Sequence, residues 1–269
     1  MFYSEIKKDI KRFVKVSGEL DRKTVVVFFA VAILQTVSWY YTSRSFFIQN
    51  FRDYFIHSEA DYLKLFEFLY WFIGDFFTNF VVPLLIIKIL FRENGKDYGV
   101  TWGDFRSGMG YTGVSLMIML PLIWYASSKQ EFLLVYPHLL PARDSWELLL
   151  YYEAGMLLYM ISWEFIWRGF MLFGLYPKFG FYAVLIQMIP FLILHNGKPA
   201  LETFSAIAGG IALGAIALRT GSFFYGVIIH ISIMYAIDIL AVLRYKTGDY
   251  GLAPSSFVNL LIELFKGLK

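Results

Sequence analysis

The feature that most constrains this chain is the recurrence of apolar runs about twenty residues long. A hydrocarbon core about 30 Å thick is crossed by roughly 20 helical residues, and the sequence supplies that length repeatedly over its 269 residues. Hydrophobic residues make up 58% of the chain and charged residues 17%, whereas soluble domains have about 45–50% and about 25%. The sequence therefore predicts an all-α fold, a polytopic bundle of transmembrane helices.

The apolar pattern predicts about seven spans. They cover residues 24–41, 68–90, 108–126, 146–175, 179–195, 202–218 and 223–243. No soluble domain or low-complexity linker interrupts them, so we expect residues 24–243 to form one bundle. Within the sixth span, Ala206, Gly210 and Gly214 form a stripe of small residues that lets another helix approach closely.

Both ends of the chain have the character of interfacial segments. Residues 1–23 combine seven Lys and Arg with apolar residues at helical spacing, which is typical of a basic amphipathic helix on a membrane surface. Residues 244–269 are expected to end in a second interfacial helix. Basic residues before the first span and after the second favour a cytoplasmic N-terminus. We therefore expect an integral protein of a bacterial plasma membrane, with the lipid bilayer as a partner.

Composition excludes several classes of chemistry. The chain has no cysteine, which rules out disulfides, thiolate nucleophiles and iron–sulfur ligation. Its net charge of +3 is too small to indicate a nucleic-acid partner. The sequence has no H-E-x-x-H, G-x-G-x-x-G or P-loop motif, so the mechanisms that depend on them lose support.

Ionisable residues within spans are costly and usually face the bundle interior or a wet cavity. The fourth span carries Glu153, Glu164 and Arg168. At 100° per residue, Glu164 and Arg168 are about 40° apart and Glu153 and Glu164 about 20°, so all three line one helix face. The alternative is a self-neutralising pair, because Glu followed four residues later by Arg is a favourable order.

Two histidines and two further acids accompany that face. His195 ends the fifth predicted span and Glu202 opens the sixth, where the helix dipole alone could account for an acid. The last span carries His230 and Asp238. Taken alone, His230 would be interpreted as a packing residue, but the combined pattern predicts a polar site between the helices. His57 and His138 fall in predicted loops and are expected to face solvent.

Two histidines and two carboxylates that converge suit two kinds of chemistry. In hydrolysis, a carboxylate takes a proton from water and histidines donate to the developing oxyanion. In metal binding, imidazole and carboxylate hold a divalent cation. The residue types do not choose between them. A non-enzymatic membrane protein, such as a small transporter or a binding protein, is the competing class.

The spacing of these residues resembles that of a known family. The motifs are Glu164-x-x-x-Arg168, then Phe191-x-x-x-His195, then His230 in the last span. This order resembles the Abi/CPBP family of membrane proteins, which comprises CAAX-type prenyl endopeptidases and bacteriocin-processing or immunity proteins. The family pattern is E-E-x-x-x-R, F-x-x-x-H and H-x-x-x-N or D. The resemblance covers about residues 146–243, a CPBP-like core.

Two positions depart from that pattern. Trp163 stands where the family has its first Glu, and Met234 stands at the final N or D. The resemblance implies an intramembrane endopeptidase in which that Glu activates water and the N or D orients the oxyanion. Either this chain is a divergent peptidase, with Glu202 or Asp238 supplying a missing polar group, or it is an inactive scaffold or immunity protein with the same fold.

The resemblance also implies roles for the retained residues. Glu164 would activate water, and His195 and His230 would hold the water and polarise the carbonyl. Arg168 would orient Glu164, with Glu202, Asp238 and Glu153 in support. The substrate would be a membrane-associated protein or peptide. No cofactor is firmly implied; if a divalent metal binds, His195, His230 and Glu164 would be its ligands.

Overall fold

The computed structural model describes residues 2–198 and 200–267, and every regular element in those ranges is helical. The α-helices are α1 (Phe2–Gly18), α2 (Arg22–Val37), α3 (Arg44–Asn50), α4 (Ala60–Phe76), α5 (Val82–Leu85), α6 (Phe105–Ser127), α7 (Gln130–Val135), α8 (Trp146–Glu164), α9 (Leu172–Phe179), α10 (Tyr182–Ile193), α11 (Ala200–Thr220), α12 (Phe224–Thr247) and α13 (Pro254–Gly267). Shorter 3-10 and π-helical turns are η1 (Ser38–Thr42), η2 (Arg52–Phe55), η3 (Phe77–Val81), η4 (Ile86–Phe91), η5 (Gly95–Tyr98), η6 (Leu140–Arg143) and η7 (Phe165–Met171). The predicted all-α, polytopic helical bundle is confirmed.

Six helical stretches in the described chain are long and apolar enough to cross a membrane, rather than seven. They are Arg22–Thr42, Ala60–Phe91, Phe105–Ser127, Trp146–Phe179, Glu202–Thr220 and Phe224–Thr247. The crossing expected over residues 179–195 is instead the 12-residue α10, about 18 Å long at 1.5 Å per residue. Gly180, at φ +53°, ends α9 before it, and Gly197, at φ +97°, lies in the turn after it.

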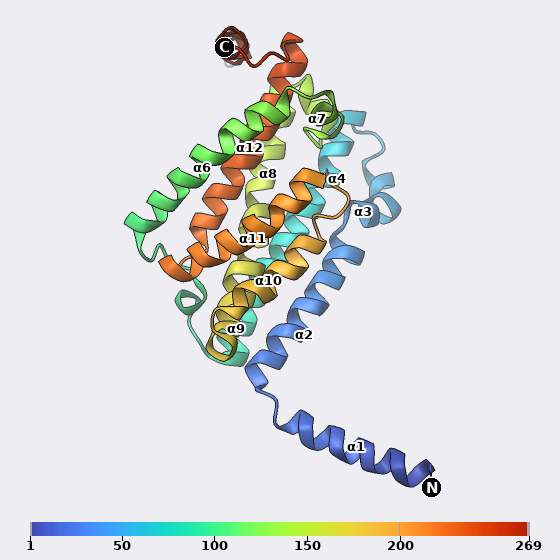
Figure 1. Cartoon of the computed structure of the whole chain (residues 1–269). Coiled ribbons are helices and arrows are strands. Elements are labelled where there is room, and N and C mark those ends of the chain that lie inside the picture. Colours follow the sequence, from blue (N-terminus) through green and yellow to red (C-terminus); the bar gives the residue numbers. More distant parts are fainter. Residues whose placement is uncertain (1, 199, 268–269) are drawn as a thin grey trace.

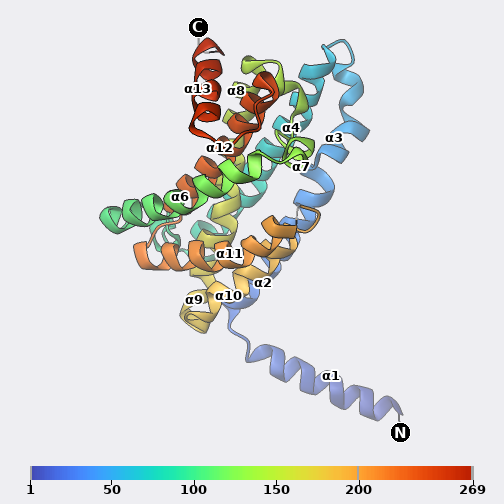
Figure 2. The same cartoon turned by 45° about the horizontal axis from the view of Figure 1, so that its top comes forward.

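The helices pack around α8 and its continuation. Helix α8 contacts α4 and α12, α12 also contacts α6, and α10 lies along α11. In both views α11 runs at an angle to α8 and α12, and the two chain ends lie at opposite ends of the molecule (Figures 1 and 2). Helix α1 projects away from the bundle (Figure 1). The side chains of Ile6 and Ile10 on α1 are exposed, those of Phe2 and Phe13 lie outside the described residues, and binding of α1 to a membrane surface stays a prediction.

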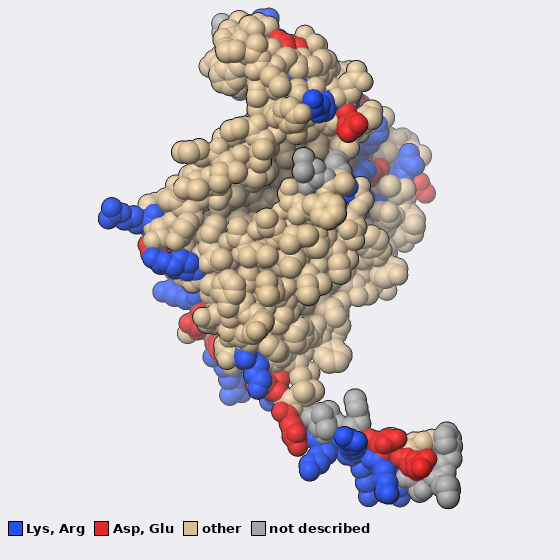
Figure 3. All heavy atoms as spheres, in the orientation of Figure 1, with Lys and Arg blue, Asp and Glu red and all other residues tan. Residues whose placement is uncertain are grey.

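Burial is greatest in α8 and η7, the helical stretch that contains Glu164. Phe165, Trp167 and Phe170 in η7 are completely buried. The outer face of the bundle, by contrast, exposes large apolar side chains such as Met117 and Ile89. Apolar surface of that extent on one face is expected where lipid, not water, is the solvent. Figure 3 agrees, because charged side chains gather near the ends of the molecule and on α1 and leave the middle of the visible face uncharged.

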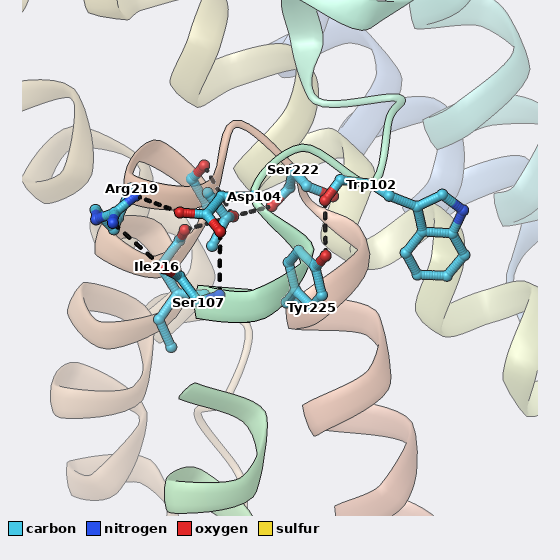
Figure 4. Close-up of polar contacts among 9 residues, drawn as sticks. Trp102, Asp104, Ser107, Ile216, Arg219, Ser222 and Tyr225 are labelled. Carbon is cyan, nitrogen blue, oxygen red and sulfur yellow. Dashed lines mark hydrogen bonds and ion pairs between the residues drawn. The ribbon is translucent and has the colours of Figure 1, made fainter. Parts of the chain in front are cut away.

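A hydrogen-bonded cluster holds the start of α6 against the turn between α11 and α12 (Figure 4). Asp104 caps α6 by accepting from the Ser107 backbone N–H, and its other carboxylate oxygen accepts from Arg219 at 2.9 Å. The Tyr225 hydroxyl donates to the carbonyl oxygen of Trp102 at 2.7 Å. These bonds fix where α12 begins, and therefore the position of His230 along the axis of the bundle.

Candidate active site

The structure brings Glu164, Arg168 and His230 into direct contact. Glu164 ends α8, Arg168 lies one turn later in η7, and His230 lies on α12. Arg168 Nη1 donates to Glu164 Oε1 at 3.0 Å, and His230 Nδ1 lies 2.8 Å from the same oxygen. Because a carboxylate only accepts, Nδ1 of His230 is the donor. Glu164 and Arg168 are both 0% exposed.

Gly226 lets that carboxylate approach α12. A Cβ at this position would lie 2.5 Å from Glu164 Oε2 and 3.3 Å from Glu164 Cδ. Gly226 is one helical turn before His230, so the same stretch of α12 supplies both the space for the acid and its imidazole partner. The close approach of backbone to carboxylate is what holds Glu164 away from solvent.

Phe191 connects this pair to the second histidine. The Arg168 guanidinium lies over the Phe191 ring at 4.0 Å, and the Phe191 and His195 rings have centroids 4.5 Å apart. His195 lies in the turn after α10, and its Nδ1 donates to the Phe191 carbonyl oxygen at 2.8 Å. Burial lowers the pKa of His195 to about 4, so the ring is neutral near pH 7 with its lone pair on Nε2.

Both histidines line one cavity of about 390 Å³. Trp163 and Met234 line it as well, so four of the six polar positions of the family pattern lie in the cavity wall: Trp163, His195, His230 and Met234. Glu164 and Arg168 are not among the residues that line it. His195 and His230 therefore both line the cavity, whereas Glu164 lies behind His230 and does not.

The three supporting acids lie elsewhere. Glu202 accepts hydrogen bonds from Lys198 and Tyr136, each at 2.7 Å, and neither bond involves His195. Glu153 on α8 and Asp238 on α12 are buried near each other, and none of their four carboxyl oxygens makes a hydrogen bond within the described residues. These three acids do not line the cavity. Glu202 contributes to His195 only through its charge nearby.

The donor set does not fit a divalent metal. Among the described residues no group of three or more His, Asp or Glu side chains is placed to hold one. Glu164 Oε1 already accepts from Arg168 and His230, and Oε2 faces the backbone of Gly226. A cation would have to compete with the Arg168 guanidinium for the same carboxylate, which is electrostatically unfavourable.

Other polar residues reach the cavity from parts of the chain that the motif did not include. Arg44, Asp75, His138 and Lys198 all line it. His138 is thus not the solvent-facing loop residue that was expected, and burial lowers its pKa to about 4. Asp75 was detectable as an acid within an apolar span. The position of His138 has no local signal, because it depends on how the loop before α8 folds back over the bundle.

Comparisons with known proteins support the resemblance drawn from the motifs. A family model described as Type II CAAX prenyl endopeptidase Rce1-like matches residues 145–236. The search found no curated protein and no solved structure that matches the chain. The matched segment runs from the residue before α8 into α12 and contains Glu164, Arg168, His195 and His230. Residues 145–236 are therefore similar to the Rce1-like CAAX prenyl endopeptidases, in agreement with the Abi/CPBP resemblance of the motifs.

Proposed function

We propose that this protein is an intramembrane endopeptidase that hydrolyses a peptide bond of a membrane-associated protein or peptide bound in the cavity. The observation that carries the proposal is that His195 and His230, from different elements of the matched segment, line the same cavity. Two imidazoles at one wet, partly enclosed site can move a proton and polarise a carbonyl group. The cavity also contains the apolar side chains that a membrane-borne substrate requires.

The hydrogen bonds of the two rings assign their free nitrogens. His195 uses Nδ1 for the Phe191 carbonyl, which leaves Nε2 to accept a proton from water as it attacks the peptide carbonyl, and to pass that proton to the amine that leaves as the C–N bond breaks. His230 uses Nδ1–H for Glu164, and in its imidazolium form the Nε2–H donates to the carbonyl oxygen as negative charge develops on it. General-base catalysis contributes about 10²–10⁴-fold to the rate, and the pKa of His195, lowered to about 4 by burial, places its contribution toward the low end of that range.

In this proposal Glu164 and Arg168 are positioning residues. The sequence-based hypothesis gave Glu164 the role of water-activating base. Its complete burial and its bonds to Arg168 and His230 favour a different role, since a base must reach the water that it activates. Glu164 fixes the orientation of the His230 ring, and Arg168 compensates the buried carboxylate charge.

A second candidate function is binding without hydrolysis. It is favoured by Trp163 and Met234, which line the cavity where the family pattern has an acid and an amide or acid. The Trp163 and His195 ring centroids are 6.1 Å apart, so an indole lies beside the imidazole. A scaffold or immunity protein could use such an apolar wall to bind a peptide and leave it intact.

Comparative terminal proteomics of membranes tests the proposal. Cells with the wild-type protein should contain cleaved termini that disappear on deletion of the gene and on His195→Ala or His230→Ala substitution. His57→Ala is the matched control, because His57 is exposed and outside the cavity. Melting temperatures of the purified variants separate loss of chemistry from loss of folding. Unchanged cleavage in both site variants would contradict the proposal.

A restoring variant distinguishes the two candidates. The double substitution Trp163→Glu and Met234→Asn places an acid and an amide at the two departures. If the wild type already hydrolyses its substrate, cleavage should rise in the variant from a measurable base level. If cleaved termini appear only in the double variant, the wild-type protein is a binding protein with the family fold.

A further inference from the structure

Asp75 is a buried carboxylate in the cavity without a cationic partner. It lies on α4, is 3% exposed and lines the cavity, yet α4 is outside the segment that matches the family. Within the described residues, no Lys, Arg or His makes an ion pair with it. Buried charges are normally paired, and an ionisable group at membrane depth is retained for a function.

The other charged groups of the cavity contrast with it. Arg44 pairs with Glu67 at 3.0 Å, and Lys198 pairs with Glu202 at 2.7 Å. Both basic side chains that line the cavity are therefore already neutralised by acids of their own. Asp75 is the acid among the described lining residues whose charge is left uncompensated.

Neutral donors hold the carboxylate in place. Ser38 Oγ and Thr42 Oγ1 donate to Oδ1 at 2.6 and 2.5 Å, and Trp71 Nε1 donates to Oδ2 at 3.0 Å. Oδ2 thus receives one donor from the protein and keeps a lone pair for a ligand. These hydrogen bonds orient the carboxylate but do not neutralise its charge. A cation from outside the chain can therefore compensate it.

Aromatic rings continue the wall from Asp75 toward the histidines. The ring centroids of Trp71 and Tyr159 are 4.8 Å apart, and those of Tyr159 and Trp163 are 5.7 Å apart. All three rings line the cavity. Aromatic faces attract organic cations by about 0.5–2 kcal/mol each, most strongly when water is excluded. A carboxylate next to such a wall is the chemistry that recognises an ammonium group.

We propose that the cavity wall formed by Asp75, Trp71, Tyr159 and Trp163 binds the organic ammonium group of a ligand, such as a lysine side chain or a quaternary ammonium. The ammonium charge compensates Asp75, and its methylene or methyl groups contact the rings. This site is independent of hydrolysis. It holds a ligand whether or not the histidines go on to cleave it.

Calorimetric titration of the full chain in phosphatidylglycerol nanodiscs, which carry no ammonium headgroup, tests this site. The probes are choline and Nα-acetyl-lysine methylamide, and the neutral isosteres are 3,3-dimethylbutanol and Nα-acetyl-norleucine methylamide. At least one ammonium probe should bind at least tenfold more tightly than its isostere. Tighter binding of choline would indicate that the ammonium group comes from a lipid headgroup. Tighter binding of Nα-acetyl-lysine methylamide would indicate that it comes from a peptide.

Substitution completes the test. Asp75→Asn should weaken the ammonium probe at least tenfold and leave the isosteres unchanged, while Asp61→Asn, an exposed acid on the same helix, should change nothing. Trp71→Phe keeps a ring but removes one hydrogen-bond donor to Asp75, so it should weaken binding of the ammonium probe by a smaller factor. This variant carries the test if Asp75→Asn does not fold. Equal binding of cation and isostere, or equal binding in wild type and both site variants, would overturn the proposal. Cleavage is not measured, so this result is separate from that of the peptidase test.

Discussion

At the scale of single residues, burial rather than residue type decides what each charged side chain can do. Glu164 and Asp75 are both buried acids, but Glu164 is bonded to Arg168 behind His230 and Asp75 lines the cavity. The motif spacing indicated that an acid and two imidazoles converge, and the structure joins Glu164 to Arg168 and His230 by hydrogen bonds. The spacing could not predict which side of that contact faces the cavity.

Gly226→Ala should damage the site without altering any charged group. The new Cβ would lie 2.5 Å from Glu164 Oε2, so the carboxylate must shift away from His230. We expect a loss of about 1–3 kcal/mol in stability, as for other overpacked positions, and a fall in cleavage. Thermal unfolding and the terminal-proteomics assay measure the two effects. Wild-type values for both would show that the close approach is not required.

Acidification should destabilise the protein through His138 and His195. Burial lowers the pKa of each to about 4, below the ordinary value of about 6.5. The unfolded chain therefore takes up protons before the folded chain does. Stability is complete above about pH 6.5 and falls as the pH drops toward 4, by at most about 1.4 kcal/mol per unit for each histidine.

The pH dependence is measured as the difference between wild type and His138→Gln in thermal unfolding. The variant should lose less stability than the wild type between pH 6.5 and 4.5. Parallel curves over that window would mean that His138 is accessible to protons in the folded protein.

At the scale of elements, small residues determine how α10 reaches the site. The predicted small-residue stripe is confirmed: a Cβ on Gly210 would lie 2.9 Å from Met188, and one on Gly214 would lie 2.9 Å from Gln187 Nε2. Close contact with α11 positions α10, and α10 in turn places Phe191 and His195. The stripe predicted a close helix approach without naming the partner, and the predicted span over residues 179–195 was too long because an apolar run alone does not reveal the break at Gly180.

Gly214→Ala and Gly209→Ala form a matched pair on α11. Gly214 faces α10, whereas a Cβ on Gly209 meets nothing within 4 Å. Gly214→Ala should destabilise the protein by about 1–3 kcal/mol and lower cleavage through displacement of His195. Gly209→Ala should be neutral or stabilising by up to about 1 kcal/mol, from helix propensity. Equal melting temperatures for the two variants would contradict close packing of α10 on α11.

At the scale of the whole molecule, the bundle has two ends separated by an uncharged face. Figure 1 places the start of α2 at one end and the loop after α6 at the other, and Figure 3 shows an uncharged face between them. Basic residues near the first span favour a cytoplasmic N-terminus. The orientation of the molecule in the membrane stays a prediction from charge.

Cysteine labelling tests that orientation with little background, because the chain has no cysteine. Glu19→Cys, just before α2, should react with a membrane-impermeant maleimide only after the cells are permeabilised. Lys129→Cys, beyond the end of α6, should react in intact cells. Both residues are exposed, so burial does not limit the reaction. The reverse labelling pattern would mean that the N-terminus lies outside.

The sequence by itself determined the membrane class, the helical architecture and the pairing of Glu164 with Arg168. Hydrophobic run length and helical periodicity are local properties, and the contact between Glu164 and Arg168 lies within one helical stretch. Only the tertiary structure decided which groups face the cavity, among them His195, His230, Trp163 and Met234 from the matched segment and Asp75 and His138 from outside it. The physical reason is that a cavity wall is made by helices far apart in the chain, and their rotation and depth depend on packing that no single segment encodes.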